Sequence, residues 1–503
     1  MKNFIMILIS ALLGLYGCTG IQQTEEQTYM NPILGGDYPD PTVVHVGDDY
    51  YMTHSSFNRM PALTVLHSND LVNWEAVSFG LSKYLGSVWA PDICFYKGKY
   101  YIYFTVSQGN DDFSTWVVTA FDPCGEWSEP VDLCLGEWID PCQAVDEETG
   151  QRWLFLSGGH RIRLSDDGLS TVGELEKVYD GWKYPTEWVT EGKALEGPKM
   201  KHIGEWYYWL NAEGGTGGAP TSHMTIVARS HSIDGPWEND PDNPIVHTYS
   251  GNERWWSKGH GSLVDAPDGS WYIIYHAYEN GFLNNGRQTL MEPVEIDHEG
   301  WIVAPTGKDV DKALTAPICS RTSAPQDKLA EFRVGLEWKT YQDYSPERFI
   351  ATDKSITIKG QGDDLGNSSL LLFPTGEHKY DVSVKIELEG EATAGFTLFY
   401  KEKFFVGFGF DKDNTYRWRR GAKRRMHANE KGTALWLKLH FDNNAVSGSY
   451  STDGENWVKE EFGMEVSGYN HNTLDEFQSL MPGVFVYGEG KAKFSEFNYL
   501  SLD

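Results

Sequence analysis

The chain has 503 residues, which is more than one ordinary hydrophobic core organises, so we expect two domains. Its 72 acidic and 42 basic residues give a formal net charge of −30. Phosphate backbones and anionic lipid headgroups repel such a chain, which excludes nucleic acid as a partner. The 19 Trp and 27 Tyr residues offer many flat apolar faces and favour a neutral substrate, although most of them belong in a core.

The first 18 residues predict a targeting segment that is not part of the fold. Its apolar run, residues 4–15, is too short for a comfortable membrane span. The run ends in Leu15-Tyr16-Gly17-Cys18, which resembles a bacterial lipobox, so cleavage before Cys18 and lipidation there would anchor the protein. A plain signal peptide is the alternative. We expect residues 19–28 to form a polar tether on an exported bacterial envelope protein, periplasmic or at the cell surface, that meets the membrane only through this anchor.

Five short aromatic strands then recur, each entered through a glycine turn. The turn glycines lie 51, 52, 54 and 65 residues apart. A period of about 40–50 residues with several strands per unit is typical of a β-propeller, and five repeats indicate five blades. We assign residues 29–316 to this propeller and expect almost no helix. The turn glycines are Gly47, Gly98, Gly150, Gly204 and Gly269.

A run of mostly small residues, 317–328, predicts a linker, and the pattern of apolar and polar residues changes after it. Apolar and polar residues alternate with period two in segments separated by polar turns, which predicts an antiparallel β-sandwich over residues 329–503. The expected fold is therefore all-β, a five-bladed propeller followed by a sandwich. The alternating segments are 355–358, 380–386, 395–400 and 435–439.

Three carboxylates lie beside Pro or Gly-Pro, each just before an aromatic repeat. They are Asp40 in Tyr38-Pro39-Asp40-Pro41, Asp140 in Trp138-Ile139-Asp140-Pro141, and Glu196 in Leu195-Glu196-Gly197-Pro198. They precede their turn glycines by 7, 10 and 8 residues. This register places all three on the strands that line the central funnel, where flanking Pro and Gly suit a bent strand.

Three converging acids match the hydrolysis of a glycoside. One carboxylic acid protonates the leaving oxygen, and in the inverting case a second carboxylate deprotonates a water on the far face of the sugar. A third can raise the pKa of the proton donor by like-charge repulsion. A single Asp-Pro or Glu-Gly-Pro is more often only a turn, but three in register with a repeat favour a hydrolase.

At this point the chain resembles glycoside hydrolase family 43 over about residues 30–305. The opening motif is Asn31-Pro32-Ile33-Leu34-Gly35-Gly36-Asp37-Tyr38-Pro39-Asp40-Pro41. Four later motifs follow in order: Trp89-Ala90-Pro91-Asp92, Ala212-Glu213-Gly214-Gly215-Thr216, Gly259-His260-Gly261 and Gly286-Arg287-Gln288-Thr289. The resemblance implies a five-bladed propeller and an inverting, mostly exo-acting hydrolase of pentose-containing plant polysaccharides.

The resemblance also implies roles for the three acids. Asp40 would be the general base, Glu196 the general acid, and Asp140 the residue that tunes and orients Glu196. Asp37 and Glu191 stand nearby but lack the Pro-Asp-Pro or Glu-Gly-Pro context, so we expect neither to act in catalysis.

Four further residues are carried over from the family. Arg287 would place a guanidinium near sugar hydroxyls and Asp140, and Trp89 and Phe57 would wall the pocket and stack on the sugar. His260 resembles a central-channel histidine that can join a hydrated calcium site, although a lone histidine is more often hydrogen-bonded structure. We expect no required cofactor, with Ca²⁺ as the one candidate.

Two departures from the family's xylosidases fall near the expected sugar pocket. Lys199 follows Glu-Gly-Pro where such enzymes often have His, and Asn58-Arg59 follows Phe57 where they often have an acidic and an aromatic residue. These changes leave xylose and arabinofuranose both open. The C-terminal stretch resembles the concanavalin-like sandwich of many members, which either packs on the propeller and shapes the pocket rim or binds glycan separately.

The leading hypothesis is an exo-glycosidase that releases xylose or arabinofuranose from a plant cell-wall oligosaccharide or polysaccharide, with the oligomeric state open. An endo-acting arabinanase would need an open groove, and a sandwich packed over the funnel rim would argue against it. A non-catalytic surface glycan-binding lipoprotein would have lost at least one acid, and none is lost. A fructan-cleaving propeller would carry an Asn-Asp-Pro-Asn type of opening, which is absent.

Overall fold

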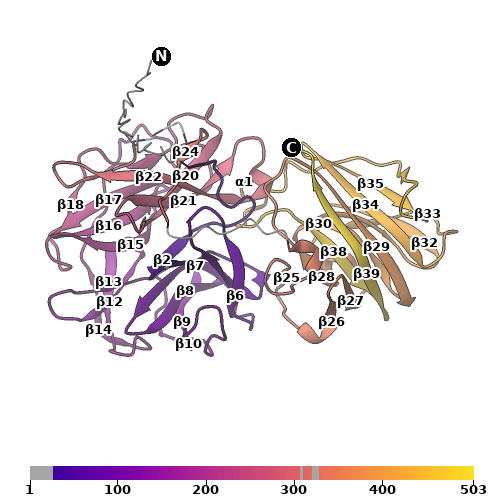
Figure 1. The fold of residues 1–503 in the computed structure, drawn as a ribbon, viewed down its shortest axis with the longest axis horizontal. Helices are drawn as coiled ribbons and strands as arrows, with labels where there is room; N and C mark the ends of the chain where they lie inside the picture. The colour runs from indigo at the N-terminus through magenta and orange to yellow at the C-terminus, as the bar shows by residue number, and fades with distance from the viewer. Residues whose placement is uncertain (1–26, 306, 308–309, 320–327) are drawn as a thin grey trace, which may run out of the picture.

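The computed structural model describes residues 27–305, 307, 310–319 and 328–503, and most of them lie in β-strands (Figure 1). The expected signal peptide, Cys18 and most of the tether lie outside these residues. Within them, no helix is both long and apolar enough to cross a membrane. The described helices are α1 (His471–Leu474) and five short 3₁₀ turns: Ser157–Gly159, Leu283–Asn285, Leu329–Glu331, Pro346–Arg348 and Leu365–Asn367.

The N-terminal half forms five antiparallel sheets with their main strands in chain order. The first contains β2 (Thr42–Val46), β3 (Asp49–Thr53), β5 (Ala62–Ser68) and β6 (Glu75–Leu81). The second contains β7 (Ser87–Tyr96), β8 (Lys99–Gly109), β9 (Asp112–Ala120) and β10 (Val131–Asp132). The third contains β11 (Cys142–Val145), β12 (Arg152–Leu156), β13 (His160–Leu164) and β14 (Thr171–Lys177). The fourth contains β15 (Leu195–Ile203), β16 (Trp206–Glu213), β17 (Met224–Ser230), β18 (Glu238–Asn239) and, also on β17, β19 (Val246–His247). The fifth contains β20 (Trp255–Asp265), β21 (Trp271–Glu279), β22 (Arg287–Ile296) and β23 (Ile302–Val303).

The five sheets close into a ring. Their first strands contact one another in the cycle β2, β7, β11, β15, β20 and back to β2. The short strand β1 (Thr28–Tyr29) pairs with β24 (Leu314–Thr315) and fastens the two ends of this half together. Residues at the start of the first strands therefore face a shared central channel.

The second strand of every sheet is one of the aromatic repeats, and its two faces pack against different neighbours. In β16, Tyr207 and Trp209 pack toward the third sheet, whereas Tyr208 and Leu210 pack toward the fifth. Successive side chains of a strand point to opposite faces, and in these strands both faces are buried. This burial explains why aromatic and aliphatic residues predominate in the repeats.

The C-terminal half is a two-layered sandwich (Figure 1). One sheet contains, in order, β26 (Phe349–Thr352), β27 (Ser355–Lys359), β39 (Gly490–Ser501), β29 (Lys379–Gly390), β34 (Ala434–Asp442), β35 (Ala445–Ser451) and β36 (Val458–Lys459), with β37 (Met464–Glu465) also on β35. The other contains β28 (Ser369–Leu372), β38 (Met481–Tyr487), β30 (Thr393–Lys401), β31 (Phe404–Phe410), β32 (Asn414–Arg419) and β33 (Ala422–Ala428).

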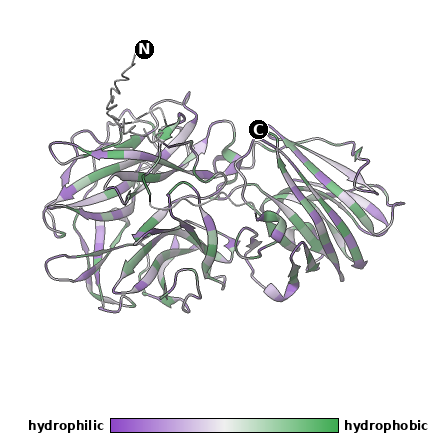
Figure 2. Cartoon of the chain, viewed as in Figure 1, coloured by the Kyte–Doolittle hydropathy of each residue, from purple (hydrophilic) through white to green (hydrophobic). Residues whose placement is uncertain are grey.

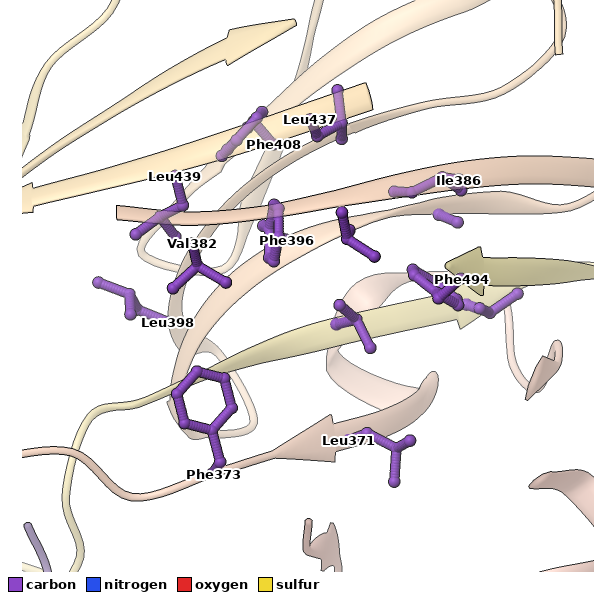
Figure 3. Close-up of a cluster of buried hydrophobic side chains, with 14 of the residues drawn as sticks. Leu371, Phe373, Val382, Ile386, Phe396, Leu398, Phe408, Leu437, Leu439 and Phe494 are labelled. Carbon is purple, nitrogen blue, oxygen red and sulfur yellow. The ribbon is translucent and has the colours of Figure 1, made fainter. Parts of the chain in front are cut away.

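The sandwich core lies between these sheets. Figure 3 shows Val382 and Leu439 of one sheet facing Phe396 and Leu398 of the other. Hydrophobic and hydrophilic residues alternate along the strands (Figure 2), as expected for sheets with one buried face. The predicted all-β fold, a repeat-built half followed by an antiparallel sandwich, is confirmed.

The two halves are joined by more than the chain between them. β25 (Thr340–Tyr341) precedes the sandwich strands but pairs with β4 (Arg59–Met60) of the N-terminal half. The ammonium of Lys339, beside it, donates hydrogen bonds to the carbonyl of Pro61 (3.2 Å) and to Oγ1 of Thr64 (2.6 Å). These contacts fix the sandwich beside the first sheet, next to one mouth of the channel.

Candidate active site

The three predicted acids stand at the same end of the channel. Asp40 and Asp140 come two residues before β2 and β11, and Glu196 is the second residue of β15. Asp40 and Asp140 both have positive φ angles, 56° and 59°, a conformation that costs free energy in a non-glycine residue and is often kept at functional sites.

A small pocket of about 50 Å³ opens at this point. All seven residues predicted to form the site line it, together with five that were not predicted as site residues. The predicted residues are Asp40, Phe57, Trp89, Asp140, Glu196, His260 and Arg287; the additional ones are Ala90, Ile139, Thr216, His223 and Phe477.

Asp40 lies in a dense network of donors. Arg287 donates from Nη1 to Oδ1 (3.0 Å) and from Nη2 to Oδ2 (3.3 Å), and the Ser55 hydroxyl donates to Oδ2 (2.5 Å). Nδ1 of His260 lies 3.3 Å from Oδ1. Burial alone would raise the pKa of Asp40, but the Arg287 guanidinium and His260 together hold it well below its usual range. Asp40 is therefore a carboxylate at working pH.

A buried histidine supports Asp40 from behind. The backbone N–H of Asp40 donates to Nδ1 of His276 (3.1 Å), and Nε2 of the same ring lies 3.0 Å from Oγ1 of Thr216. Burial, reinforced by the charge of Arg287, lowers the pKa of His276 to about 3. The ring is therefore neutral, and its Nδ1 also lies 3.1 Å from Oδ1 of Asp40.

Glu196 and Asp140 form the opposite case. Burial raises the pKa of Glu196 well above its usual range, and the charges of Asp140, Asp40 and Glu191 raise it further. Oδ2 of Asp140 accepts a hydrogen bond from the N–H of Gly197 (2.9 Å), which holds this carboxyl beside the peptide that follows Glu196. Burial raises the pKa of Asp140 as well. The pocket thus contains the ionised Asp40 and, in Glu196, a carboxyl that retains its proton.

Gly197 is required by its surroundings as well as by its φ of +57°. A Cβ at this position would lie 2.8 Å from Nε2 of His260. The Glu-Gly-Pro motif therefore lets the chain pass directly over the histidine and brings Glu196 into the pocket. Nε2 of His260 has no hydrogen-bond partner among the described residues.

Asp40, His260 and His276 could each offer one ligand atom to a metal ion, and these atoms lie within 4.8 Å of one another. Calcium takes six to eight oxygen ligands. Here two of the three donors are imidazole nitrogens, and the single carboxylate already binds Arg287. These residues do not fit a directly coordinated Ca²⁺. Binding of hydrated calcium at His260 stays a prediction, and no chemical step below depends on it.

The aromatic wall of the pocket comes from both halves of the chain. Phe57 and Trp89 belong to the propeller half, and Phe477 belongs to the segment after α1 of the sandwich. The ring of Phe477 stacks on Phe57 (centroids 6.2 Å apart) and meets Trp89 edge-on (5.7 Å). His471 also stacks on the Phe477 ring, with centroids 3.9 Å apart. The pocket is complete only with the sandwich in place.

Several expected positions differ from the structure. Arg287 binds Asp40 rather than Asp140. Lys199 does not line the pocket, because its ammonium donates to the carbonyl of Pro91 (3.1 Å) and to Asp92 (3.3 Å).

Asn58 and Arg59 also lie outside the pocket. The Asn58 side chain accepts a hydrogen bond from Tyr84, and Arg59 points into the sandwich. Asp37 and Glu191, which were not expected to act in catalysis, do not line the pocket either.

Phe477, His276, Thr216 and Ser55 were missed by the sequence analysis. Thr216 stands inside a motif quoted for the family resemblance, so the signal for it was present. Phe477 lies in a segment without periodicity, on the other domain, and nothing in its local sequence marks it.

Comparisons with known proteins match both halves of the chain. The profile described as Glycosyl hydrolases family 43 matches residues 29–302, and that described as Beta xylosidase C-terminal Concanavalin A-like domain matches residues 327–501. A non-reducing end alpha-L-arabinofuranosidase of Bacteroides ovatus is 32% identical over 389 residues, which cover 72% of this chain and 70% of that protein. A beta-xylosidase of Bacillus subtilis is 29% identical over 330 residues, covering 58% and 60%.

Solved structures agree in fold. The crystal structure of a GH43 protein from Bacillus licheniformis superposes with a TM-score of 0.84 at 25% identity, covering 94% of this chain and all of that one. Because the family profile spans more than half of the chain and the second profile spans the sandwich, the chain belongs to glycosyl hydrolase family 43 and carries its C-terminal concanavalin A-like domain.

Proposed function

We propose that this glycosidase is an inverting exo-enzyme that releases terminal xylose or arabinofuranose from plant hemicellulose or from pectin side chains. The single observation that carries the hydrolytic chemistry is the opposite direction of two pKa shifts in one small pocket, which leaves Asp40 ionised and Glu196 protonated. Inversion is what the family resemblance implies. The names of the relatives, an alpha-L-arabinofuranosidase and beta-xylosidases, support both pentoses.

The reaction follows from these two states. Glu196 gives its proton to the glycosidic oxygen as the bond from that oxygen to the anomeric carbon breaks, so the leaving group departs as a neutral alcohol. Asp40 takes a proton from a water molecule, whose oxygen attacks the anomeric carbon from the opposite face. Asp140 keeps the pKa of Glu196 high and does not itself exchange a proton with substrate. The products are a pentose of inverted configuration and a shortened glycan.

The shape of the site supports exo rather than endo cleavage. The pocket of about 50 Å³ shares Phe57, Trp89 and Phe477 with an outer groove of about 520 Å³. The acids line the smaller of these two spaces, so a single terminal sugar ring would reach them while the rest of the glycan stays in the groove outside. The sandwich segment at the rim argues against the long open cleft that an endo-arabinanase would need.

No cofactor is required in this scheme, because Asp40 and Glu196 supply both proton transfers.

We further propose export and lipid anchoring at Cys18, which would place the enzyme at the bacterial envelope beside its polymer. The anchor is tested by following the incorporation of labelled fatty acid into the unaltered chain and into Cys18→Ala. Equal labelling of these two proteins would refute lipid anchoring at Cys18.

The proposed reaction is tested with nitrophenyl β-xyloside and nitrophenyl α-arabinofuranoside. We expect release from at least one, abolished in Asp40→Asn. Glu196→Gln should lose hydrolysis of the matching pentose oligosaccharide, whose leaving alcohol needs the proton, far more than hydrolysis of the nitrophenyl glycoside. Glu213→Gln is the matched control, since burial raises the pKa of Glu213 to about 8 and this residue does not line the pocket. Activity on the oligosaccharide retained in Glu196→Gln, or a product of retained configuration by NMR, would refute the mechanism.

A further inference from the structure

One surface of the sandwich carries a charge opposite to that of the chain. The hairpin of β32 and β33 contains six Lys or Arg residues and no acidic residue between positions 417 and 425. The whole chain has a net charge of −30. The hairpin lies at the far side of the sandwich from the propeller half (Figure 1). We call residues 417–425 the basic hairpin.

The basic hairpin is open to solvent. β33 is the last strand of its sheet, and Ala422, Lys423, Arg424 and Arg425 are all exposed. Outermost strands are commonly charged, which prevents edge-to-edge aggregation. A lysine or two would suffice for that purpose, so protection of the edge does not account for five arginines.

The pairing of the two strands brings like charges together. Arg417 of β32 lies directly opposite Arg424 of β33, and Arg425 lies opposite Tyr416. Like charges in directly opposed cross-strand positions destabilise a sheet. An anion bound between the guanidinium groups would remove this repulsion.

The protein does not itself supply that anion. Among the residues that the structure describes, no carboxylate forms an ion pair with Arg417, Arg419, Arg424 or Arg425. The ammonium of Lys423, the one lysine of the hairpin, already has partners within the sandwich. It donates to the Tyr487 hydroxyl (2.5 Å) and lies 4.0 Å from the centre of the Tyr416 ring. Arg425 also donates from Nε to Oδ1 of Asn414, so these four arginines are left without an anionic partner.

We propose that the basic hairpin binds a carboxylate-bearing polysaccharide, a uronate polymer whose neutral pentose branches the propeller pocket removes. The guanidinium fork matches a planar carboxylate with two parallel hydrogen bonds, which an ammonium cannot do. The hairpin exposes no large apolar side chain of the kind that inserts into a bilayer. The proposal rests on the proposed function, since it names the polymer that carries the released pentose.

The test is binding of the full chain to immobilised polygalacturonate, with neutral arabinan as reference. We expect binding to polygalacturonate that weakens as NaCl rises from about 0.05 M to about 0.5 M. The combined variant Arg417→Gln, Arg419→Gln, Arg424→Gln and Arg425→Gln should bind at least about tenfold more weakly. Its matched control removes four exposed lysines from the other sheet: Lys359→Gln, Lys459→Gln, Lys491→Gln and Lys493→Gln.

Equal loss in both variants would overturn the proposal, because net charge alone would then explain binding. Binding to vesicles of phosphatidylglycerol but not to polygalacturonate would overturn it in favour of a membrane surface. Hydrolysis of nitrophenyl pentosides is measured on the same proteins and should be unchanged in the arginine variant. Binding without hydrolysis in the unaltered chain would refute the proposed function while leaving the binding surface in place.

Discussion

Arg287 holds both carboxylate oxygens of Asp40, with Nη1 3.0 Å from Oδ1 and Nη2 3.3 Å from Oδ2. The same guanidinium lies 5.1 Å from the centre of the Phe477 ring. One side chain therefore connects the ionised base with the wall contributed by the sandwich. The strength of the base and the shape of the pocket depend on the same residue.

Arg287→Lys should move the acidic limb of the pH–rate profile. A lysine keeps one positive charge but loses the two-pronged contact, so the pKa of Asp40 rises and the base becomes protonated at a higher pH. We expect the acidic limb to shift toward neutral pH and kcat/KM to fall about tenfold to a hundredfold. Arg254→Lys, which alters an ion pair with Glu279 outside the pocket, is the control. An unmoved acidic limb in Arg287→Lys would show that Arg287 does not set the state of Asp40.

Asp140→Asn should move the basic limb of the pH–rate profile. Activity requires protonated Glu196 and is lost as pH rises through the pKa of this group. The charge of Asp140 is one cause of the raised pKa, so its removal lowers that pKa and shifts the basic limb toward acid. Asp240→Asn, a buried residue outside the pocket, should leave the profile unchanged. A basic limb that stays in place in Asp140→Asn would assign it to another group.

The sequence predicted the three acids because each has a local signal, a Pro or Gly-Pro context, at a constant distance from a repeat. The prediction that Lys199 lies near the sugar pocket was wrong, because the direction of a strand side chain depends on the pairing register of the strand. The pairing of β15 with β16 shifts between Glu196 and Lys199, so the strand turns Lys199 toward Asp92 and away from the pocket. The sequence did not predict Phe477, because that residue enters the pocket through domain packing, which leaves no periodicity in the sequence.

Phe477→Ala should weaken substrate binding more than it slows the chemical step. The ring contacts Phe57 and Trp89 and carries no group that transfers a proton in the scheme. Loss of this wall should raise KM about tenfold, with a smaller change in kcat. Phe282→Ala removes an aromatic ring that stacks on His378, at another contact between the halves and outside the pocket. An equal rise of KM in both variants would attribute the effect to domain packing in general.

Arg59 should act on the site through Phe477, although it does not line the pocket. Its Nη2 donates to the carbonyls of Phe399 (3.2 Å), Tyr400 (3.1 Å) and Ser479 (3.1 Å), all in the sandwich. Ser479 is two residues beyond Phe477, so this guanidinium fastens the segment that carries the wall. Arg59→Met should free the segment and leave buried carbonyls without donors, which raises KM and destabilises the fold by about 2–4 kcal/mol.

A double-mutant cycle separates positioning from stability. If Arg59 acts by placing Phe477, then Arg59→Met should raise KM strongly in the unaltered chain and hardly at all in Phe477→Ala. Arg59→Lys should recover part of the effect, because an ammonium can reach some of the same carbonyls. The loss of stability, measured by thermal unfolding, should appear in both backgrounds. Additive effects on KM would mean that Arg59 stabilises the domain contact without placing Phe477, and the wall of the pocket would then be held by His471 and its other neighbours.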